Sequence, residues 1–199
     1  ASLLHGMRQD HAVLQRYQPI RIWGNAQAGA KIQVSLDAHR ASSLANETGK
    51  WEVRLPSMPA GGRDTLTVSD GVSTQSVGDV LMGDVWLCSG QSNMELPVWR
   101  ALDAVSELGS ASSPTIRLLT VPQSASPVPL ESFPSTAQWQ TVDADSLREF
   151  SAACFYFARE LQKSVDVPMG LIDASWGGSR IQAWIDADAL KTDPRYRES

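Results

Sequence analysis

The hydrophobic pattern of this chain changes character near residue 80, and this change constrains the fold more than any other feature of the sequence. From about residue 12 to residue 80, apolar and polar residues alternate in short runs, at 20–23, 31–36, 51–55 and 65–68. Such alternation is typical of strands that bury one face. Segments rich in Gly, Asn, Asp and Pro separate these runs and supply turns. The first 80 residues are therefore predicted to form an all-β sandwich.

After residue 80 the apolar runs are shorter and continuous. Residues 84–88, 116–121 and 169–174 each form such a run, which suits strands buried on both faces of a parallel sheet. Between the last two, apolar residues recur at steps of three and four from Phe150 to Leu161, which predicts an amphipathic helix ending near Lys163. Residues 181–185 are expected to form a second helix-like stretch. Strands and helices thus alternate over residues 81–199, which indicates an α/β sheet.

Composition excludes several classes of function. The 17 Lys and Arg residues against 22 Asp and Glu give a net charge of −5 without a basic cluster, so a nucleic-acid partner is not expected. No apolar run is long enough for a membrane helix, so no membrane partner is expected either. The first residues have neither the basic nor the apolar part of a signal peptide, so any export signal is expected to have been removed already.

The cysteines and histidines do not predict a metal site. Cys88 and Cys154 are too few for a disulfide scaffold and too few for a zinc site without clustered histidines, and both are interpreted as small buried apolar residues. The histidines, His5, His11 and His39, lie in the first fifth of the chain and none pairs with another at metal-ligand spacing. Neither a metal nor a cofactor is predicted.

Ser92 is the first candidate for chemistry. The buried run at 84–88 is followed by Ser89, Gly90, Gln91 and Ser92, which places Ser92 at the carboxyl end of the predicted parallel sheet, where open α/β folds build their sites. Gly90 permits a tight turn, and free backbone N–H groups nearby could hold an oxyanion. The alternative is that Ser92 only caps a helix, because serine is a preferred N-cap residue. Spacing alone leaves both interpretations open.

Three separated motifs carry a resemblance to a known family. Residues 88–95 (Cys-Ser-Gly-Gln-Ser-Asn-Met-Glu) and 170–184 resemble the sialate O-acetylesterase family of carbohydrate esterases within the SGNH hydrolase superfamily, and residues 10–16, 22–24 and 49–51 resemble the β-domain that precedes its catalytic domain. The resemblance implies an all-β N-terminal sandwich (residues 1–80) followed by the first part of an α/β SGNH-hydrolase, flavodoxin-like domain (residues 81–199), incomplete at its C-terminus. It implies a serine esterase without cofactor that removes O-acetyl groups from a sugar or glycan.

The resemblance also implies roles for individual residues. Ser92 would be the nucleophile, and its own N–H and that of Gly178 would form the oxyanion hole. Gln91, Gly177, Trp176 and Arg180 are candidate substrate contacts. Trp176 could stack on a sugar or pack in the protein, and Arg180 could bind a polar sugar or form a surface ion pair.

The chain also departs from the family pattern. It has no C-terminal Asp-x-x-His motif to supply a general base and no Gln-Gly-Glu-x-Asn block to supply a side-chain oxyanion donor. Asp37 and His39 precede the nucleophile and are interpreted as a loop pair, and His11 belongs to the β-domain. Residues 81–199 contain three candidate parallel strands, fewer than the about five of a complete doubly wound sheet, so a sheet edge would be exposed.

The missing parts lead to an expectation about partners. The remainder of the same protein, as a second chain or a further segment, should complete the sheet and the site, and this chain alone should be inactive. The polar, Pro-containing residues 191–199 are expected to form a surface loop. The acetylated carbohydrate is the expected substrate and the expected location is extracytoplasmic. A non-catalytic carbohydrate-binding protein with a vestigial esterase domain is the main alternative; a lipase or peptidase is a third that no feature supports.

Overall fold

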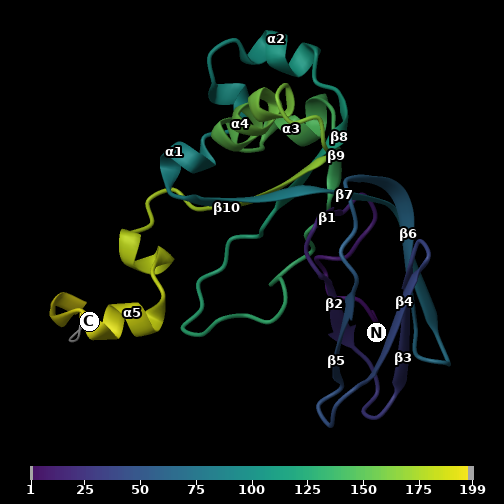
Figure 1. Cartoon of the computed structure of the whole chain (residues 1–199). Helices are drawn as coiled ribbons and strands as arrows, with labels where there is room; N and C mark the ends of the chain where they lie inside the picture. The colour runs from purple at the N-terminus through teal and green to yellow at the C-terminus, as the bar shows by residue number, and fades with distance from the viewer. Residues whose placement is uncertain (1, 197–199) are drawn as a thin grey trace.

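The computed structural model describes residues 2–196 and is a mixed, sheet-dominated α/β structure (Figure 1). Its strands are β1 (Val13–Gln15), β2 (Ile20–Asn25), β3 (Lys31–Leu36), β4 (His39–Leu44), β5 (Lys50–Leu55), β6 (Gly61–Ser69), β7 (Thr74–Gly90), β8 (Ser113–Thr120), β9 (Gln140–Val142) and β10 (Met169–Ser175). Its α-helices are α1 (Ser92–Glu95), α2 (Ala104–Gly109), α3 (Ala144–Arg148), α4 (Ala152–Gln162) and α5 (Ala187–Thr192), with 3-10 turns η1 (Val98–Arg100), η2 (Ile181–Trp184) and η3 (Pro194–Tyr196).

Apart from the short β1, which pairs parallel with β7, the N-terminal part consists of antiparallel strands, as the alternating pattern predicts. Strands β2 and β5 pair with each other, and β4, β3, β6 and the first part of β7 follow one another in the larger sheet. Every second residue of β3 is buried, including Ile32 and Leu36, each at 0% exposure. These residues belong to one apolar cluster with Ile22 of β2 and Leu55 of β5. Burial of alternate residues therefore holds the two sets of strands together.

Strand β7 connects the two halves of the molecule. Its residues 74–82 pair antiparallel with β6, residues 81–83 pair parallel with β1, and residues 84–90 pair parallel with β10. The strand runs through residue 80 without a break, so the division of the chain into residues 1–80 and 81–199 stays a prediction. The end of β7 places Ser92 at the carboxyl end of the parallel strands.

In the C-terminal part the order of strands is β7, β10, β8 and β9, of which the first three are parallel (Figure 1). The three strands match the apolar runs that the sequence analysis singled out. Helix α4 also forms where the three- and four-residue spacing predicts it, with Ser151 accepting the backbone N–H of Cys154 as the N-cap. The α3 and α4 helices cover one side of this sheet, and α2 lies beyond them (Figure 1). Helix α4 buries Phe155 and Ala158 against the sheet. The short antiparallel β9 was not anticipated.

The two cysteines form a disulfide, so their interpretation as free apolar residues is wrong. Cys88 near the end of β7 is bonded to Cys154 in α4, and both residues are buried, at 7% and 1% exposure. Burial was expected, but the pairing was not, because 66 residues separate the two positions in sequence. The disulfide links α4 covalently to β7, the strand that precedes Ser92.

The segment after β10 agrees with its predicted structure in one part and differs in another. Residues 181–184 form the short 3-10 turn η2, within the helix-like stretch expected at 181–185. Residues 191–196 form the end of α5 and the turn η3 rather than a loop without secondary structure, and residues 197–199 lie outside the described residues. This C-terminal segment projects from the rest of the molecule (Figure 1).

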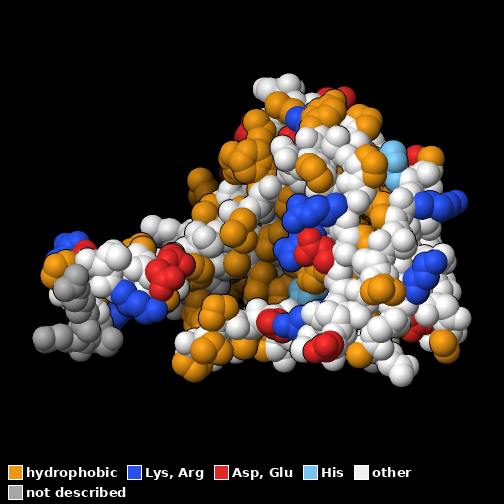
Figure 2. All heavy atoms as spheres, turned by 60° about the horizontal axis from the view of Figure 1, so that its bottom comes forward, with side chains coloured by type: hydrophobic (Ala, Val, Ile, Leu, Met, Phe, Trp, Pro, Cys, Tyr) orange, Lys and Arg blue, Asp and Glu red, His pale blue; other side chains and the backbone are white. Residues whose placement is uncertain are grey.

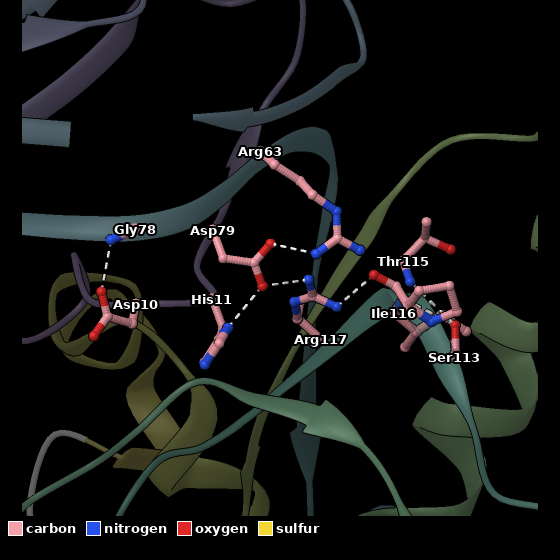
Figure 3. Close-up of polar contacts among 10 residues, drawn as sticks. Asp10, His11, Arg63, Gly78, Asp79, Ser113, Thr115, Ile116 and Arg117 are labelled. Atoms are coloured by element: carbon pink, nitrogen blue, oxygen red, sulfur yellow. Dashed lines mark hydrogen bonds and ion pairs between the residues drawn. The ribbon is translucent and has the colours of Figure 1, made fainter. Parts of the chain in front are cut away.

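A cluster of charges joins the two parts of the molecule (Figure 3). Asp79 of β7 lies 2.7 Å from both His11 Nδ1 and the Arg117 guanidinium of β8, and 2.9 Å from the Arg63 guanidinium of β6. Arg117 is 1% exposed and also donates to the Pro114 carbonyl. Although burial opposes it, the hydrogen bond from His11 and the charges of Arg117 and Arg63 lower the pKa of Asp79. The carboxylate thus offsets the cost of a buried guanidinium at the junction.

Candidate active site

Ser92 lies directly beyond the carboxyl end of β7. The strand ends at Gly90, Gln91 is the N-cap residue of α1, and Ser92 is the first residue of that helix. Ser92 is exposed, and within residues 2–196 its hydroxyl has no hydrogen-bond partner. Because Gln91 occupies the cap position, the alternative role of Ser92 as a helix cap does not apply here. The serine presents a free hydroxyl at the site-forming edge of the parallel strands.

The turn after β10 lies against the Ser92 segment. Ser175 at the end of β10 is the register partner of Gly90, and the Trp176 N–H donates to the Gly90 carbonyl at 2.9 Å. A Cβ atom placed on Gly177 would lie only 3.6 Å from the Ser92 Cα atom. Two motifs that are more than 80 residues apart in sequence therefore meet at one edge because β7 and β10 are neighbours and parallel.

The two glycines of this turn differ in their contacts. The Gly177 N–H donates to the Glu95 carboxylate at 2.6 Å. Gly178 has a φ of +77°, which favours glycine, and within the described residues its N–H has no acceptor. Of the two, Gly178 thus has the backbone donor that is available to a ligand.

The predicted substrate contacts lie around a groove beside this turn. Trp176, Gly177, Gly178, Arg180 and Trp184 line a cavity of about 580 Å³ together with residues of the 124–126 segment. Within residues 2–196 the Arg180 side chain has no acidic partner, unlike the surface ion pair considered from the sequence. Figure 2 shows hydrophobic side chains gathered on the body of the molecule beside the projecting C-terminal segment.

The orientation of the second tryptophan in this groove is fixed by hydrogen bonds. The Trp184 indole N–H donates to the Ser179 hydroxyl at 2.9 Å, and that hydroxyl donates to the Trp176 carbonyl at 2.6 Å. The Trp176 and Trp184 side chains are 39% and 38% exposed. Gln91, the remaining predicted contact, is exposed, and within the described residues its side chain makes no hydrogen bond.

Sequence reasoning missed two polar residues that support this edge. Gln123 lies three residues after the end of β8 and donates to Glu95 and to the Ser175 carbonyl. Asp173 of β10 is 5% exposed and accepts a hydrogen bond from the Ser175 hydroxyl at 2.5 Å; burial raises the pKa of this carboxyl. The position of Gln123 just after a parallel strand was a signal that could have identified it.

The histidines lie away from the serine. His5 stacks on Trp23, His11 pairs with Asp79, and His39 is the first residue of β4. All three are among the described residues, and none is hydrogen-bonded to Ser92. Residues 2–196 contain no group of three or more His, Cys, Asp or Glu side chains arranged to hold a metal ion.

A free serine hydroxyl after a parallel strand, beside a glycine turn with an unpaired N–H, is the arrangement that serine hydrolases of α/β fold use. The family model described as carbohydrate esterase, sialic acid-specific acetylesterase matches residues 82–198. The chain therefore belongs to this family.

Individual relatives agree with the family assignment. The chain is 34% identical over 187 residues to the sialate O-acetylesterases of Homo sapiens and Pongo abelii, a match that covers 85% of this chain and 36% of each relative. A solved structure of a carbohydrate acetylesterase from Xanthomonas citri superposes with a TM-score of 0.92 at 39% identity, covering 98% of this chain and 45% of that one. The chain thus spans less than half the length of these relatives.

Proposed function

We propose that this chain supplies the nucleophile half of a serine carbohydrate esterase that removes O-acetyl groups from a sugar or glycan. One observation carries the proposal: the unpaired Ser92 hydroxyl and the Gly177–Gly178 turn meet at the carboxyl ends of β7 and β10. The similarity to sialate O-acetylesterases and to a carbohydrate acetylesterase supports the same reaction class. The identity of the acetylated sugar is left open within this class.

The proposed reaction follows from these groups. Ser92 Oγ attacks the acetyl carbonyl carbon while its proton passes to a general base, and the oxyanion accepts hydrogen bonds from the N–H groups of Ser92 and Gly178. Collapse of the tetrahedral intermediate breaks the bond to the sugar oxygen, which takes up the proton and leaves. Water then attacks the acetyl-serine and releases acetate, which regenerates the Ser92 hydroxyl.

The groove beside the turn is proposed to hold the sugar. Trp176 presents a partly exposed aromatic ring that can stack on the apolar face of a pyranose, and Arg180 can donate to its hydroxyl or carboxylate groups. Gln91 precedes Ser92 in sequence and Gly177 lies beside it. Both are proposed to contact the substrate nearer to its acetyl group than Trp176 and Arg180 do.

The remainder of the protein is proposed to complete both the sheet and the site. Residues 84–90 of β7 pair with β10 on one side, and within residues 2–196 no strand pairs with their other side. Leu87 on this stretch is 67% exposed, so an apolar side chain on one face of the sheet is also left for another segment to cover. That segment would also bring the base histidine, its acidic partner and the side-chain oxyanion donor.

This part of the proposal has a direct test. Residues 1–199 expressed alone should be insoluble, or no more active on p-nitrophenyl acetate than their Ser92→Ala variant, and co-expression with the remainder should restore activity. A soluble, monomeric and fully active 199-residue product would contradict it.

We also propose a β-sandwich followed by the first part of an SGNH domain, and an extracytoplasmic location for the protein. The two sets of antiparallel strands around one apolar cluster support a β-sandwich, and the β7–β10–β8 order supports the first part of a flavodoxin-like SGNH domain. The Cys88–Cys154 disulfide supports an extracytoplasmic, oxidising location. Among residues 2–196, no helix has the length and apolar character needed to cross a membrane.

The experiment that tests the function is acetate release from acetylated sugars by the full-length protein. Ser92→Ala should abolish release, and its melting temperature should stay within a few degrees of the wild type, because the Ser92 hydroxyl makes no hydrogen bond within residues 2–196. Retention of more than a few per cent of the activity would show that Ser92 is not the nucleophile. Sugar binding without acetate release by either protein would favour the carbohydrate-binding alternative.

A further inference from the structure

The Glu95 carboxylate joins the segments that follow three neighbouring strands. Its Oε2 atom accepts the Gly177 N–H at 2.6 Å, and its Oε1 atom accepts the Gln123 side-chain N–H at 2.6 Å. Gln123 also donates to the Ser175 carbonyl at 3.1 Å. Glu95 ends α1, which Ser92 begins, so the carboxylate connects the serine helix after β7 with the turn after β10 and the loop after β8.

The fit between Glu95 and Gly177 is close. A Cβ atom on Gly177 would lie 2.2 Å from Glu95 Oε2, a distance that real Cβ atoms do not show. The carboxylate therefore occupies the space that any other residue at position 177 would need. Both donors to it are neutral, and within residues 2–196 no Lys or Arg side chain pairs with Glu95. The two hydrogen bonds to Glu95 therefore hold the turn and the loop in place without forming an ion pair.

The occupied Gly177 N–H has a consequence for the neighbouring glycine. The N–H groups of Gly177 and Gly178 could both donate to an oxyanion, but the Gly177 N–H already donates to the Glu95 carboxylate. The Gly178 N–H is left without an acceptor in the described part of the chain, on a backbone with φ +77°. Glu95 thus fixes both the distance of the turn from the serine helix and the choice of the free donor.

We propose that Glu95 is a positioning residue of the esterase, which holds the Gly177–Gly178 turn at the distance from Ser92 that the oxyanion requires. The expected effect on kcat rests on the proposed function, because it requires an active esterase. The hydrogen bond between Glu95 and Gly177 does not depend on that function. A catalytic group displaced by about 1 Å can cost about a hundredfold in rate, so loss of this contact should slow turnover without preventing substrate binding. The amide oxygen of a Gln at position 95 can still accept the Gly177 N–H, and Gln123 can turn its own amide so that its oxygen accepts the new NH2 group, so Glu95→Gln should preserve most of the effect.

The test uses the full-length protein with two readouts. Glu95→Ala should lower kcat for acetate release at least about tenfold and change KM less than about threefold, because the lost contact acts in the transition state. Hydrogen exchange, measured by mass spectrometry on a peptide spanning residues 174–180, should become faster. Glu95→Gln should stay within about threefold of the wild-type kcat. Glu47→Ala, at an exposed turn position in the N-terminal part, is the matched control and should change neither readout.

The outcomes separate this inference from the proposed function. Wild-type kcat and exchange in Glu95→Ala would overturn the inference, and so would a Glu95→Gln variant as slow as Glu95→Ala. If the wild-type protein releases no acetate, the proposed function fails, while the exchange of residues 174–180 still decides whether Glu95 holds the turn. If Glu95→Ala does not fold, Gln123→Ala replaces it: faster exchange and a lower kcat support the inference, and unchanged values of both contradict it.

Discussion

At the scale of single residues, the candidate site depends on backbone groups of two adjacent glycines. A Cβ atom on Gly177 would displace the Glu95 carboxylate, while Gly178 has open space around it but a φ of +77°, which favours glycine. The first position is thus constrained by contact and the second by conformation. This difference allows the role of Gly178 to be tested without a steric clash.

Replacement of Gly178 by Val should slow acetate release by roughly a hundredfold or more. A β-branched residue is strained at positive φ, so the turn should move and its N–H should leave the oxyanion, and loss of one such donor costs about 2.7 to 4 kcal/mol. Gly29→Val is the matched control, because Gly29 has a φ of +76° with no atom near its Cβ position. Steady-state kinetics on both variants would measure the effect. An unchanged kcat with a raised KM in Gly178→Val would instead assign the turn to substrate binding.

The sequence was informative about some of these residues and silent about others. Ser92 could be proposed from the buried strand that precedes it, and Gly177 and Gly178 from the resemblance to the sialate O-acetylesterase family. The contact between Glu95 and Gly177 could not, because it joins positions 82 residues apart and depends on the register of β10 against β7.

At the scale of elements, the disulfide is the main constraint on the layer that supports Ser92. It closes a long loop between β7 and α4 and should stabilise the fold chiefly by restricting the unfolded chain. Cys154→Ser should lower the free energy of unfolding by about 4 kcal/mol for a loop of this length. The Cys88→Ser variant and the double variant should lose the same amount, since each removes one and the same bond.

Denaturant unfolding under non-reducing conditions would measure these losses. Addition of a reductant to the wild type should reproduce them. If the reductant leaves the unfolding midpoint of the wild type unchanged, the bond is not a structural constraint in the protein.

The predicted strands and helix of the C-terminal part formed where a periodic apolar pattern had a partner to pack against. Helix α4 buries Phe155 and Ala158 against the sheet, whereas Ile181, Trp184 and Ile185 stay 38% to 65% exposed around η2. Their spacing resembles that of a helix, but within residues 2–196 they do not join any of the apolar core clusters, and tertiary packing supplies most of the stability of a helix. The pairing of Cys88 with Cys154 could not be predicted from the local sequence pattern either, because it depends on how α4 lies over β7.

At the scale of the whole molecule, the charge cluster around Asp79 links the two parts of the chain (Figure 3). Asp79→Asn should destabilise the protein by about 3 kcal/mol near neutral pH, because it leaves the buried Arg117 guanidinium without its carboxylate. Glu52→Gln, which removes the exposed ion pair with Arg21, should cost less than about 1 kcal/mol.

The effect of Asp79→Asn should depend on pH in a defined direction. The pKa of Asp79 is lower in the folded protein than the usual aspartate value of about 3.9, so its contribution is present above that value and is lost as the pH falls through the folded-state pKa. The difference in melting temperature between the wild type and the variant should therefore shrink below about pH 4. A difference that is constant from neutral to acidic pH would show that the charge of Asp79 is not what stabilises the junction.

The proposed mechanism requires Ser92 to carry the acetyl group during turnover, and trapping that intermediate is its most direct test. The full-length protein would be mixed with an activated acetyl ester, quenched in acid within the first turnover and analysed by peptide mass spectrometry. We expect an acetyl group on Ser92 that appears in a burst before steady-state acetate release and is absent from Ser92→Ala. Turnover with the acetyl group on another residue, or with no acylated residue at all, would contradict it.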